Sequence, residues 1–227
     1  MADYRVLVTG FGRFLKHGEN SSERVLGRLP RLVPAGVKLE TCLLPVEFER
    51  GWGGVREALE RGGAPDALVL LGMAARTRRI RLERLAVNLA DCESFAPRGR
   101  RAVLRPDNGG ATPVDREIVP GGPLALPARA DVKGLARALK ARGLPVEVSL
   151  SAGSYVCNDV YYRALTHLRE SRTACVFVHL PELPREEPVR VLGVHVPFLM
   201  RRTSDALSLG VQARTVAALI AELARTR

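Results

Sequence analysis

The stretch VEVSLSAGSYVCNDVYYRAL, residues 146–165, joins an apolar, β-branched run to a helix-forming run through a turn of small residues. Residues 146–150 have the composition of a strand and residues 158–168 that of a helix. Cys157 follows the small-residue turn, where the helix is expected to begin. Because a helix N-terminus stabilises an anion, a thiol there is either a small buried hydrophobe or a nucleophile.

The same alternation of strands and helices extends along the chain. Further strands are predicted over residues 5–10, 37–44, 66–71, 79–88 and 174–179, and further helices over 20–29, 48–61, 131–142 and 211–225. This pattern predicts an α/β fold, a three-layer αβα sandwich with a central, largely parallel twisted sheet, formed by residues 1–227 as a single domain. Residues 89–129 lack periodicity, and we expect Leu89 to Val103 to be mobile without substrate.

Composition and motifs restrict the class of protein. No apolar run approaches the roughly 20 residues that span a bilayer, and the N-terminus lacks the pattern of a signal peptide. We therefore expect a cytoplasmic protein with no membrane partner. The four cysteines are widely spaced with no CxxC, which argues against a metal cluster or disulfides. No glycine-rich phosphate-binding motif follows a strand, so no cofactor is predicted.

The formal net charge of +11 raises the alternative of a basic module that binds polyanions. The basic residues are scattered, nearly all are arginine, and aromatic residues make up only 5% of the chain. Because single-stranded nucleic acid is usually held by stacked aromatic rings, we favour an arginine bias on solvated faces and expect no nucleic-acid partner.

A catalytic cysteine needs a base and a group that orients the base. Of the four histidines, His17 falls in a polar loop, and His167 lies roughly 15 Å along the helix from Cys157. His179 and His195 both precede prolines at or near strand ends, so either can be the base. Glu83 is the candidate orienting group, although an acid between Arg81 and Arg84 also suits an ion pair. The residues alone thus indicate a possible cysteine hydrolase.

A series of short motifs, in order, resembles the pyroglutamyl peptidase I family of cysteine peptidases over nearly the whole chain. The most specific is Ala152 to Asn158, AGSYVCN. The others are VLVTGFGRF at 6–14, Asn20-Ser21-Ser22, LPVEF at 44–48, LERLAVN at 82–88, RPDNGG at 105–110 and FVHLP at 177–181.

The resemblance implies an enzyme that removes N-terminal pyroglutamate from peptides through a thioester intermediate. It implies Cys157 as nucleophile, His179 as base, in preference to His195, and Glu83 as the group that orients the base. The residues that it implies for substrate binding are Phe11 and Phe14 as an aromatic clamp on the pyroglutamyl ring, Asn20 as support for their loop, Tyr155 and Val156 through backbone groups, and Met73 and Arg105 at further pocket positions. A homotetramer is implied for bacterial members.

The chain also departs from the family pattern around the pocket. Residues 13–16 are RFLK where the family has PFGG, Met73 replaces a common glutamine, and Arg105 replaces an isoleucine. About ten extra residues, near Ser94 to Val103, precede the PDN motif. These changes favour, as an alternative, a relative with another acyl substrate or reduced activity.

Overall fold

The computed structural model describes residues 3–14, 19–94, 103–184, 186–191, 194–202 and 207–226; for residues 94, 186–191 and 194–202 it describes the backbone alone. A six-stranded sheet forms the centre, in the order β2-β1-β3-β10-β4-β9. Its strands are β1 (Tyr4–Phe11), β2 (Val37–Leu44), β3 (Ala67–Met73), β4 (Ile80–Glu83), β9 (Val146–Ser149) and β10 (Ala174–Leu180).

Four of these strands run in one direction and two in the other. β2, β1, β3 and β10 are mutually parallel, whereas β4 pairs antiparallel with β10 and parallel with β9. The sheet is therefore mixed but mostly parallel, and the prediction of an α/β sandwich is confirmed.

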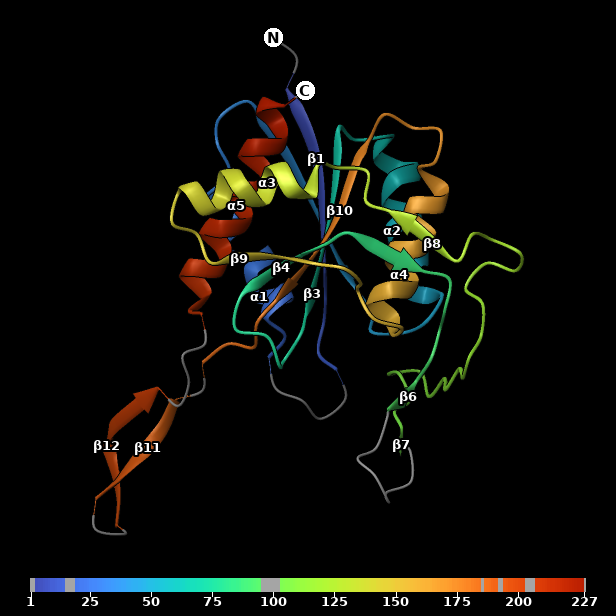
Figure 1. Cartoon of the computed structure of the whole chain (residues 1–227). Helices are drawn as coiled ribbons and strands as arrows, with labels where there is room; N and C mark the ends of the chain where they lie inside the picture. Colours follow the sequence, from blue (N-terminus) through green and yellow to red (C-terminus); the bar gives the residue numbers. More distant parts are fainter. Residues whose placement is uncertain are drawn as a thin grey trace.

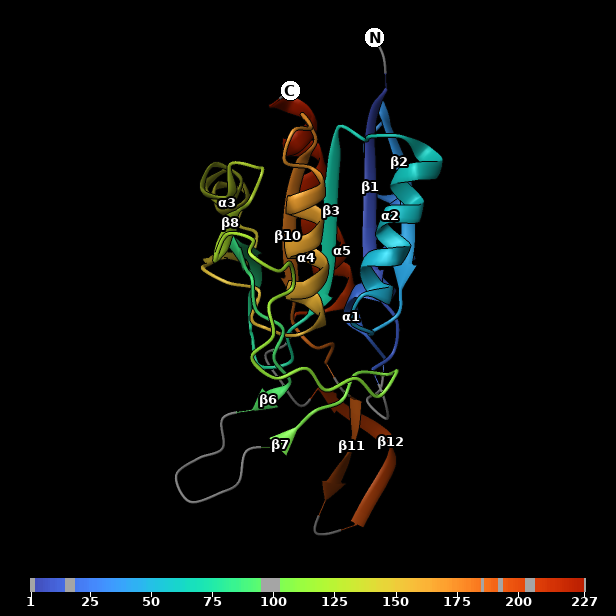
Figure 2. The ribbon, with the colours of Figure 1, turned by 90° about the vertical axis from the view of Figure 1, so that its right-hand side faces the viewer.

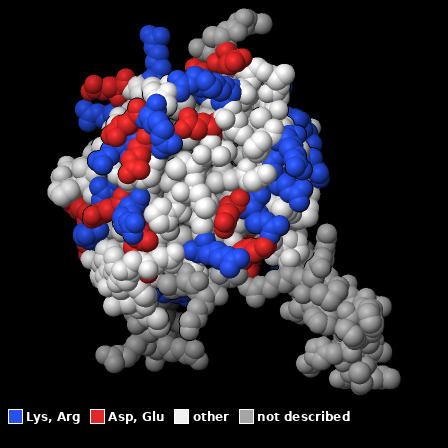
Figure 3. Space-filling model, turned by 180° about the vertical axis from the view of Figure 1, so that it is seen from behind, with Lys and Arg blue, Asp and Glu red and all other residues white. Residues whose placement is uncertain are grey.

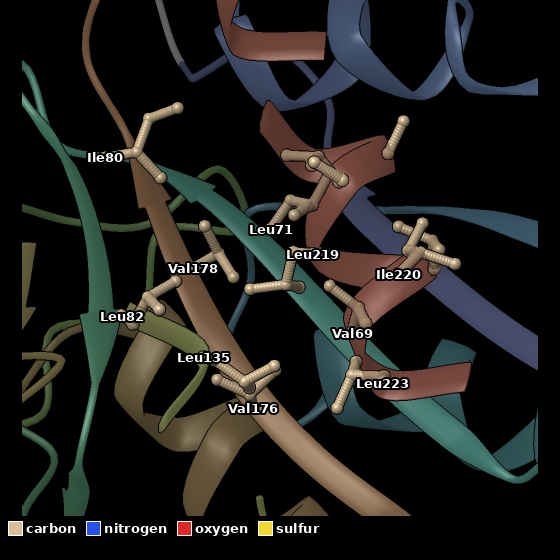
Figure 4. Packing of buried hydrophobic residues seen from close by; sticks show 14 of the residues in the cluster. Val69, Leu71, Ile80, Leu82, Leu135, Val176, Val178, Leu219, Ile220 and Leu223 are labelled. Carbon is tan, nitrogen blue, oxygen red and sulfur yellow. The ribbon is translucent and has the colours of Figure 1, made fainter. Parts of the chain in front are cut away.

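Helices cover both faces of the sheet (Figure 1). On one face lie α1 (Ser21–Leu26), α3 (Val132–Ala141) and α5 (Leu209–Arg225). On the other face, which is turned toward the viewer in Figure 2, lie α2 (Arg50–Gly62) and α4 (Val156–His167). Strand side chains alternate between the two cores because successive residues point to opposite faces. In Figure 4, Val69, Leu71, Val176 and Val178 meet Leu219 and Leu223 of α5.

The remaining elements are short and lie outside the six-stranded sheet. A 3-10 turn, η1 (Leu29–Arg31), follows α1. Three two-stranded ribbons pair β5 (Leu85–Val87) with β8 (Ala125–Pro127), β6 (Glu93–Ser94) with β7 (Val103–Leu104), and β11 (Glu186–Val191) with β12 (Val194–Arg202). Within the described ranges, no helix is both long and apolar enough to span a bilayer.

The strand predicted over residues 79–88 is wrong as a single element, because it divides at Arg84. The Arg84 N–H donates to the carbonyl of Ser149 (2.9 Å), the last residue of β9, and the Arg84 carbonyl accepts from Ala128 N (2.8 Å), just after β8. The chain thus leaves the central sheet at this residue, and β5 joins a different ribbon. Sequence periodicity does not reveal such a change of partner, since both halves are apolar and extended.

The predicted mobility of Leu89 to Val103 is wrong for its first residues. Ala90 forms a β-bridge with Arg116, and Cys92 N donates to Pro113 O (2.8 Å). Ala90 and Cys92 are both buried. Residues 95–102 lie outside the described residues, so the mobility of that part stays a prediction.

The distribution of charge bears on the polyanion alternative. On the face seen from behind, Lys and Arg side chains are interspersed with Asp and Glu (Figure 3). Several arginines are engaged in ion pairs, including Arg81 with Glu147 (2.7 Å) and Arg163 with Asp159 (3.0 Å). This mixing on that face favours an arginine-rich composition over a dedicated polyanion surface.

Candidate active site

Glu83 and His179 meet on the face of the sheet that α4 covers. Antiparallel pairing of β4 with β10 sets Glu83 opposite Phe177, and His179, two residues farther along β10, lies on the same face. His179 Nδ1 and Glu83 Oε1 are 2.8 Å apart, and both side chains are buried. A carboxylate only accepts, so Nδ1 carries the proton and Nε2 is left for another partner.

That other partner of His179 is Cys157. Burial alone lowers the pKa of the imidazole, but hydrogen bonds to Cys157 and to Glu83, with the negative charge on both, raise the pKa of His179 from 6.5 to about 9. Glu83 Oε2 has no hydrogen-bond partner among the described residues, so the histidine is the main compensation for its charge. The arrangement favours the imidazolium form of His179, which lies between the Glu83 carboxyl group and the Cys157 sulfur.

Cys157 is the second residue of α4, and its thiol is free and partly buried. The sequence predicts a helix from residue 158, just after Cys157, but α4 begins two residues earlier, at Val156. The turn before the helix uses Gly153 at φ +86°, a conformation that favours glycine. The first N–H groups of a helix have no intrahelical acceptor, so the helix N-terminus presents positive potential to the sulfur.

The sulfur fits against the sheet because Gly72 has no side chain. Gly72 pairs with His179 across β3 and β10. A Cβ added at Gly72 would lie 2.9 Å from Cys157 Sγ and 2.8 Å from Phe177 Cζ. Gly72 directly follows the strand predicted over residues 66–71. Nothing in the sequence indicates that Cys157 and Phe177 come so close to it.

Aromatic rings enclose the buried pair of Glu83 and His179. The Phe177 and His179 ring centroids are 4.8 Å apart, and those of Tyr161 and Phe177 are 5.6 Å apart. The Tyr161 hydroxyl donates to the backbone carbonyl of Glu83 at 3.2 Å. This packing excludes water from the histidine and restricts its orientation.

A second aromatic cluster lies on the loops beside the N-terminus of α4. Tyr155 contacts Phe14 and Phe48 edge-to-face, with centroids 5.7 and 5.3 Å apart. The Tyr155 hydroxyl donates to Pro106 O at 2.9 Å. Burial, with nearby negative charge, raises the pKa of Tyr155, so this residue stays a neutral donor. Phe11, by contrast, is only 2% exposed, within the core on this face of the sheet.

The backbone groups assigned to the lactam lie at the same helix end. Tyr155 is the N-cap of α4, and its carbonyl already accepts from Asn158 N (2.9 Å) and Asp159 N (3.1 Å). Val156, the first helical residue, is buried. Its own N–H and that of Cys157 precede the first acceptor that the helix can offer.

The PDN motif connects the loops around these aromatic rings. Asp107, which is buried, accepts hydrogen bonds from the N–H groups of Phe48 (2.8 Å), Gly109 (2.9 Å) and Ala111 (2.8 Å). Asn108 donates through its side chain to Arg13 O at 2.8 Å. Asp107 is therefore a structural carboxylate, and sequence reasoning did not single it out.

The other predicted pocket residues occupy varied positions. Asn20 caps α1 by accepting from Ser22 N (3.1 Å) and donates to Gly12 O (2.9 Å), so it does brace the loop after β1. Met73 ends β3 opposite Leu180, one position beyond the pair of Gly72 and His179. Arg105 is exposed. Their roles in binding substrate stay predictions.

Asn158, next to the thiol, was missed as a structural residue. Its side chain accepts from Val87 N (2.9 Å) and donates to Val87 O (2.8 Å) and Leu89 O (3.0 Å). It thus fastens the segment after β5 to the first turn of α4. The AGSYVCN motif includes it, but a buried amide that bonds a distant backbone has no local signal.

His195 lies in β12, where its backbone pairs with Arg190. Its side chain lies outside the described residues. Among the side chains that are described, no group of three or more His, Cys, Asp or Glu could hold a metal ion.

Comparison with known proteins agrees with this geometry. The family model for pyroglutamyl peptidase matches residues 4–223. A pyrrolidone-carboxylate peptidase of Gloeobacter violaceus is 36% identical over 190 residues, covering 83% of this chain and 86% of the relative. One of Streptomyces coelicolor is 32% identical over 226 residues, covering 98% and 93%.

Solved structures give the same result. The pyrrolidone carboxyl peptidase of Fervidobacterium islandicum has a TM-score of 0.79 at 31% identity, covering 98% of this chain and 99% of that one. That of Thermus thermophilus has a TM-score of 0.74 at 40% identity, covering 95% and 98%. The motifs, the fold and these matches lead to one conclusion: the chain belongs to the pyroglutamyl peptidase family.

Proposed function

We propose that this protein is a cysteine peptidase that removes an N-terminal pyroglutamyl residue from peptides, with Cys157 as nucleophile, His179 as general acid and base, and Glu83 as the orienting group. One observation carries the proposal: His179 hydrogen-bonds Glu83 through Nδ1 at 2.8 Å and also interacts with Cys157 at the start of α4. Nucleophile, base and orienting carboxylate are the parts that thiol hydrolysis requires.

The first half of the reaction forms an acyl-enzyme. With the proton already on His179, the Cys157 sulfur attacks the pyroglutamyl carbonyl carbon, and a C–S bond forms as the C=O π electrons move onto the oxygen. The oxygen that gains negative charge is stabilised by first-turn N–H groups of α4, including that of Cys157. His179 then gives its proton to the departing amine as the C–N bond breaks.

The second half frees the sulfur. Water loses a proton to His179 and attacks the thioester, the C–S bond breaks, and the sulfur is left beside the protonated His179. Pyroglutamic acid leaves. Glu83 keeps the imidazole in one tautomer through both halves without itself taking a proton. The reaction as written uses only these side chains, backbone N–H groups and water.

Specificity for the ring is assigned to the loops beside α4. Phe14 and Tyr155 offer apolar faces to the neutral, compact ring. Backbone groups of Tyr155 and Val156 are assigned to the lactam, since a site that hydrogen-bonds a substrate strongly rejects analogues lacking those groups.

The decisive experiment compares Cys157→Ser with Cys42→Ser in hydrolysis of a chromogenic pyroglutamyl amide. Cys42 is a partly buried, free thiol on β2 and serves as the matched control. Cys157→Ser should lose at least about 10⁴-fold in kcat while keeping its circular dichroism and unfolding midpoint. Activity of Cys157→Ser within about tenfold of wild type would refute the assignment of the nucleophile.

The alternative of another acyl substrate rests on the RFLK loop and Met73. It would be favoured if the wild-type protein left the pyroglutamyl amide intact but its thiol still reacted rapidly with an alkylating agent. The tetramer and the cytoplasmic location stay predictions, testable by sedimentation velocity and by cell fractionation.

A further inference from the structure

Two arginines occupy matching positions beside Tyr155. Arg13 precedes Phe14, whose ring contacts the Tyr155 ring, and Arg105 precedes Pro106, whose carbonyl accepts the Tyr155 hydroxyl hydrogen bond. Each arginine is therefore the chain neighbour of a residue that touches Tyr155. Tyr155 lies two residues before Cys157, so both arginines lie on loops that border the N-terminus of α4.

The loops that carry these arginines are tied to one another and to the body of the protein. Asn108 Nδ2 donates to Arg13 O at 2.8 Å, which joins the loop after β1 to the PDN loop. Arg105 N donates to Cys92 O at 3.1 Å, and Cys92 is buried. The backbones of both arginines are thus anchored, although both residues are exposed.

Neither guanidinium is neutralised by an ion pair with any residue whose side chain is described. Three carboxylates of this region have other partners: Asp107 accepts three backbone N–H groups, Glu47 pairs with Arg50 (2.8 Å), and Glu49 pairs with Arg116 (3.4 Å). Among the described side chains, both guanidinium groups therefore remain available to pair with a carboxylate of the substrate.

The positive charge of Arg105 acts on Tyr155, in the aromatic cluster. Burial and nearby negative charge raise the pKa of Tyr155, and Arg105 acts in the opposite direction. A guanidinium that influences the Tyr155 hydroxyl is also within electrostatic reach of a substrate resting against that ring.

The ring cannot use these charges, because pyroglutamate is neutral and its walls are apolar. In the substrate, the residue that follows pyroglutamate carries the first side chain that can be charged. We propose that Arg13 and Arg105 form a cationic rim that selects peptides with Asp or Glu directly after the pyroglutamyl residue. This inference rests on the proposed function.

The test compares three peptide amides that differ at one position: pyroglutamyl-glutamyl-alanine amide, its glutaminyl counterpart and its lysyl counterpart. The C-terminal amide removes the other carboxylate. The rim predicts a kcat/KM for the glutamyl peptide about three- to tenfold above that for the glutaminyl peptide at low salt. The preference should shrink between about 10 mM and about 500 mM salt, since exposed charges are screened. The lysyl peptide should be the poorest substrate.

Variants of the two arginines test whether they cause the preference for the glutamyl peptide. Arg13→Gln and Arg105→Gln should each reduce the ratio of glutamyl to glutaminyl kcat/KM, and the double variant should bring it near one. Arg137→Gln, an exposed arginine of α3 on the opposite face of the sheet, is the matched control and should leave the ratio unchanged. Because the readout is a ratio within one variant, a general loss of activity does not affect it.

The possible outcomes distinguish a failure of the cationic rim from a failure of the proposed peptidase function. If wild type cleaves the glutaminyl peptide but shows no salt-sensitive preference for the glutamyl one, the cationic rim is wrong and the peptidase stands. If the preference survives in the double variant, the rim is likewise wrong. If wild type cleaves none of the three peptides, the proposed function fails and the rim fails with it.

Discussion

Replacing Gly72 with alanine tests whether the thiol lies where the structure places it. The new Cβ would lie 2.9 Å from Cys157 Sγ and 2.8 Å from Phe177 Cζ, whereas ordinary van der Waals contact begins at 3.4 Å. Gly72 pairs with His179 of β10, and the strand that carries it also pairs with β1 as far as Leu70. The strand cannot easily retreat, so the sulfur and the Phe177 ring must move.

The size of the movement sets the expected effect. The sulfur must withdraw by about 0.5 to 1 Å, and a misplacement of about 1 Å can cost about 10²-fold in rate. Overpacking of a well-filled core costs about 1–3 kcal/mol of stability. We therefore expect Gly72→Ala to lower kcat about 10²-fold, to change KM little, and to lower the free energy of unfolding by about 1–3 kcal/mol.

The assay is steady-state hydrolysis of a chromogenic pyroglutamyl amide, paired with urea denaturation of the same preparations. Gly53→Ala is the control. Its Cβ would meet nothing within 4 Å, in the helix α2. Alanine is favoured over glycine within a helix by about 1 kcal/mol, so this variant should keep full activity and unfold at equal or higher urea concentration. Full activity in Gly72→Ala would show that the sulfur does not rest against this strand.

Three further predictions concern the histidine and its partners. His179→Ala should lower kcat by several orders of magnitude, and His195→Ala far less; the reverse order would move the role of base to His195. Glu83→Gln should fall between these two, with its loss mostly in kcat, and a loss as small as that of His195→Ala would remove Glu83 from the mechanism. The pKa of His179 is raised to about 9, so its imidazolium is present below that pH and lost above it. Accordingly kcat/KM should fall as the pH rises through about 9, and an NMR titration should show the same pKa lowered in Cys157→Ser; a wild-type His179 that titrates near 6.5 would contradict the pairing.

The sequence predicted the layers of the fold but not the direction of every strand. Alternating apolar runs and amphipathic segments identify strands and helices locally. The reversal of β4, and the change of partner at Arg84, depend on pairing with β10 and with β8, which lie far along the chain. No local pattern contains that information.

In the candidate site, too, local patterns could be predicted from the sequence, whereas contacts between distant residues could not. The strand–turn–helix pattern located Cys157, and the family-like motifs identified Glu83 and His179 as its partners. The roles of Gly72 and Asp107 were not found, because each depends on what the completed fold brings against it: a sulfur and a ring for Gly72, and three backbone N–H groups for Asp107.

The PDN loop has a consequence for how the site opens. Asp107 fastens Phe48, Asn108 fastens Arg13, and Pro106 fastens Tyr155, so three segments distant in sequence share one buried anchor. Hydrogen bonds to a charged group contribute about 1.5–3 kcal/mol each, so releasing the Asp107 carboxylate would free all three segments together. We therefore expect these three loops to loosen together in local unfolding, independently of the sheet that holds Glu83 and His179. Substitutions near Cys92, whose carbonyl accepts from Arg105 N just before the PDN motif, can therefore alter substrate choice. Cys157, His179 and Glu83 would keep their geometry.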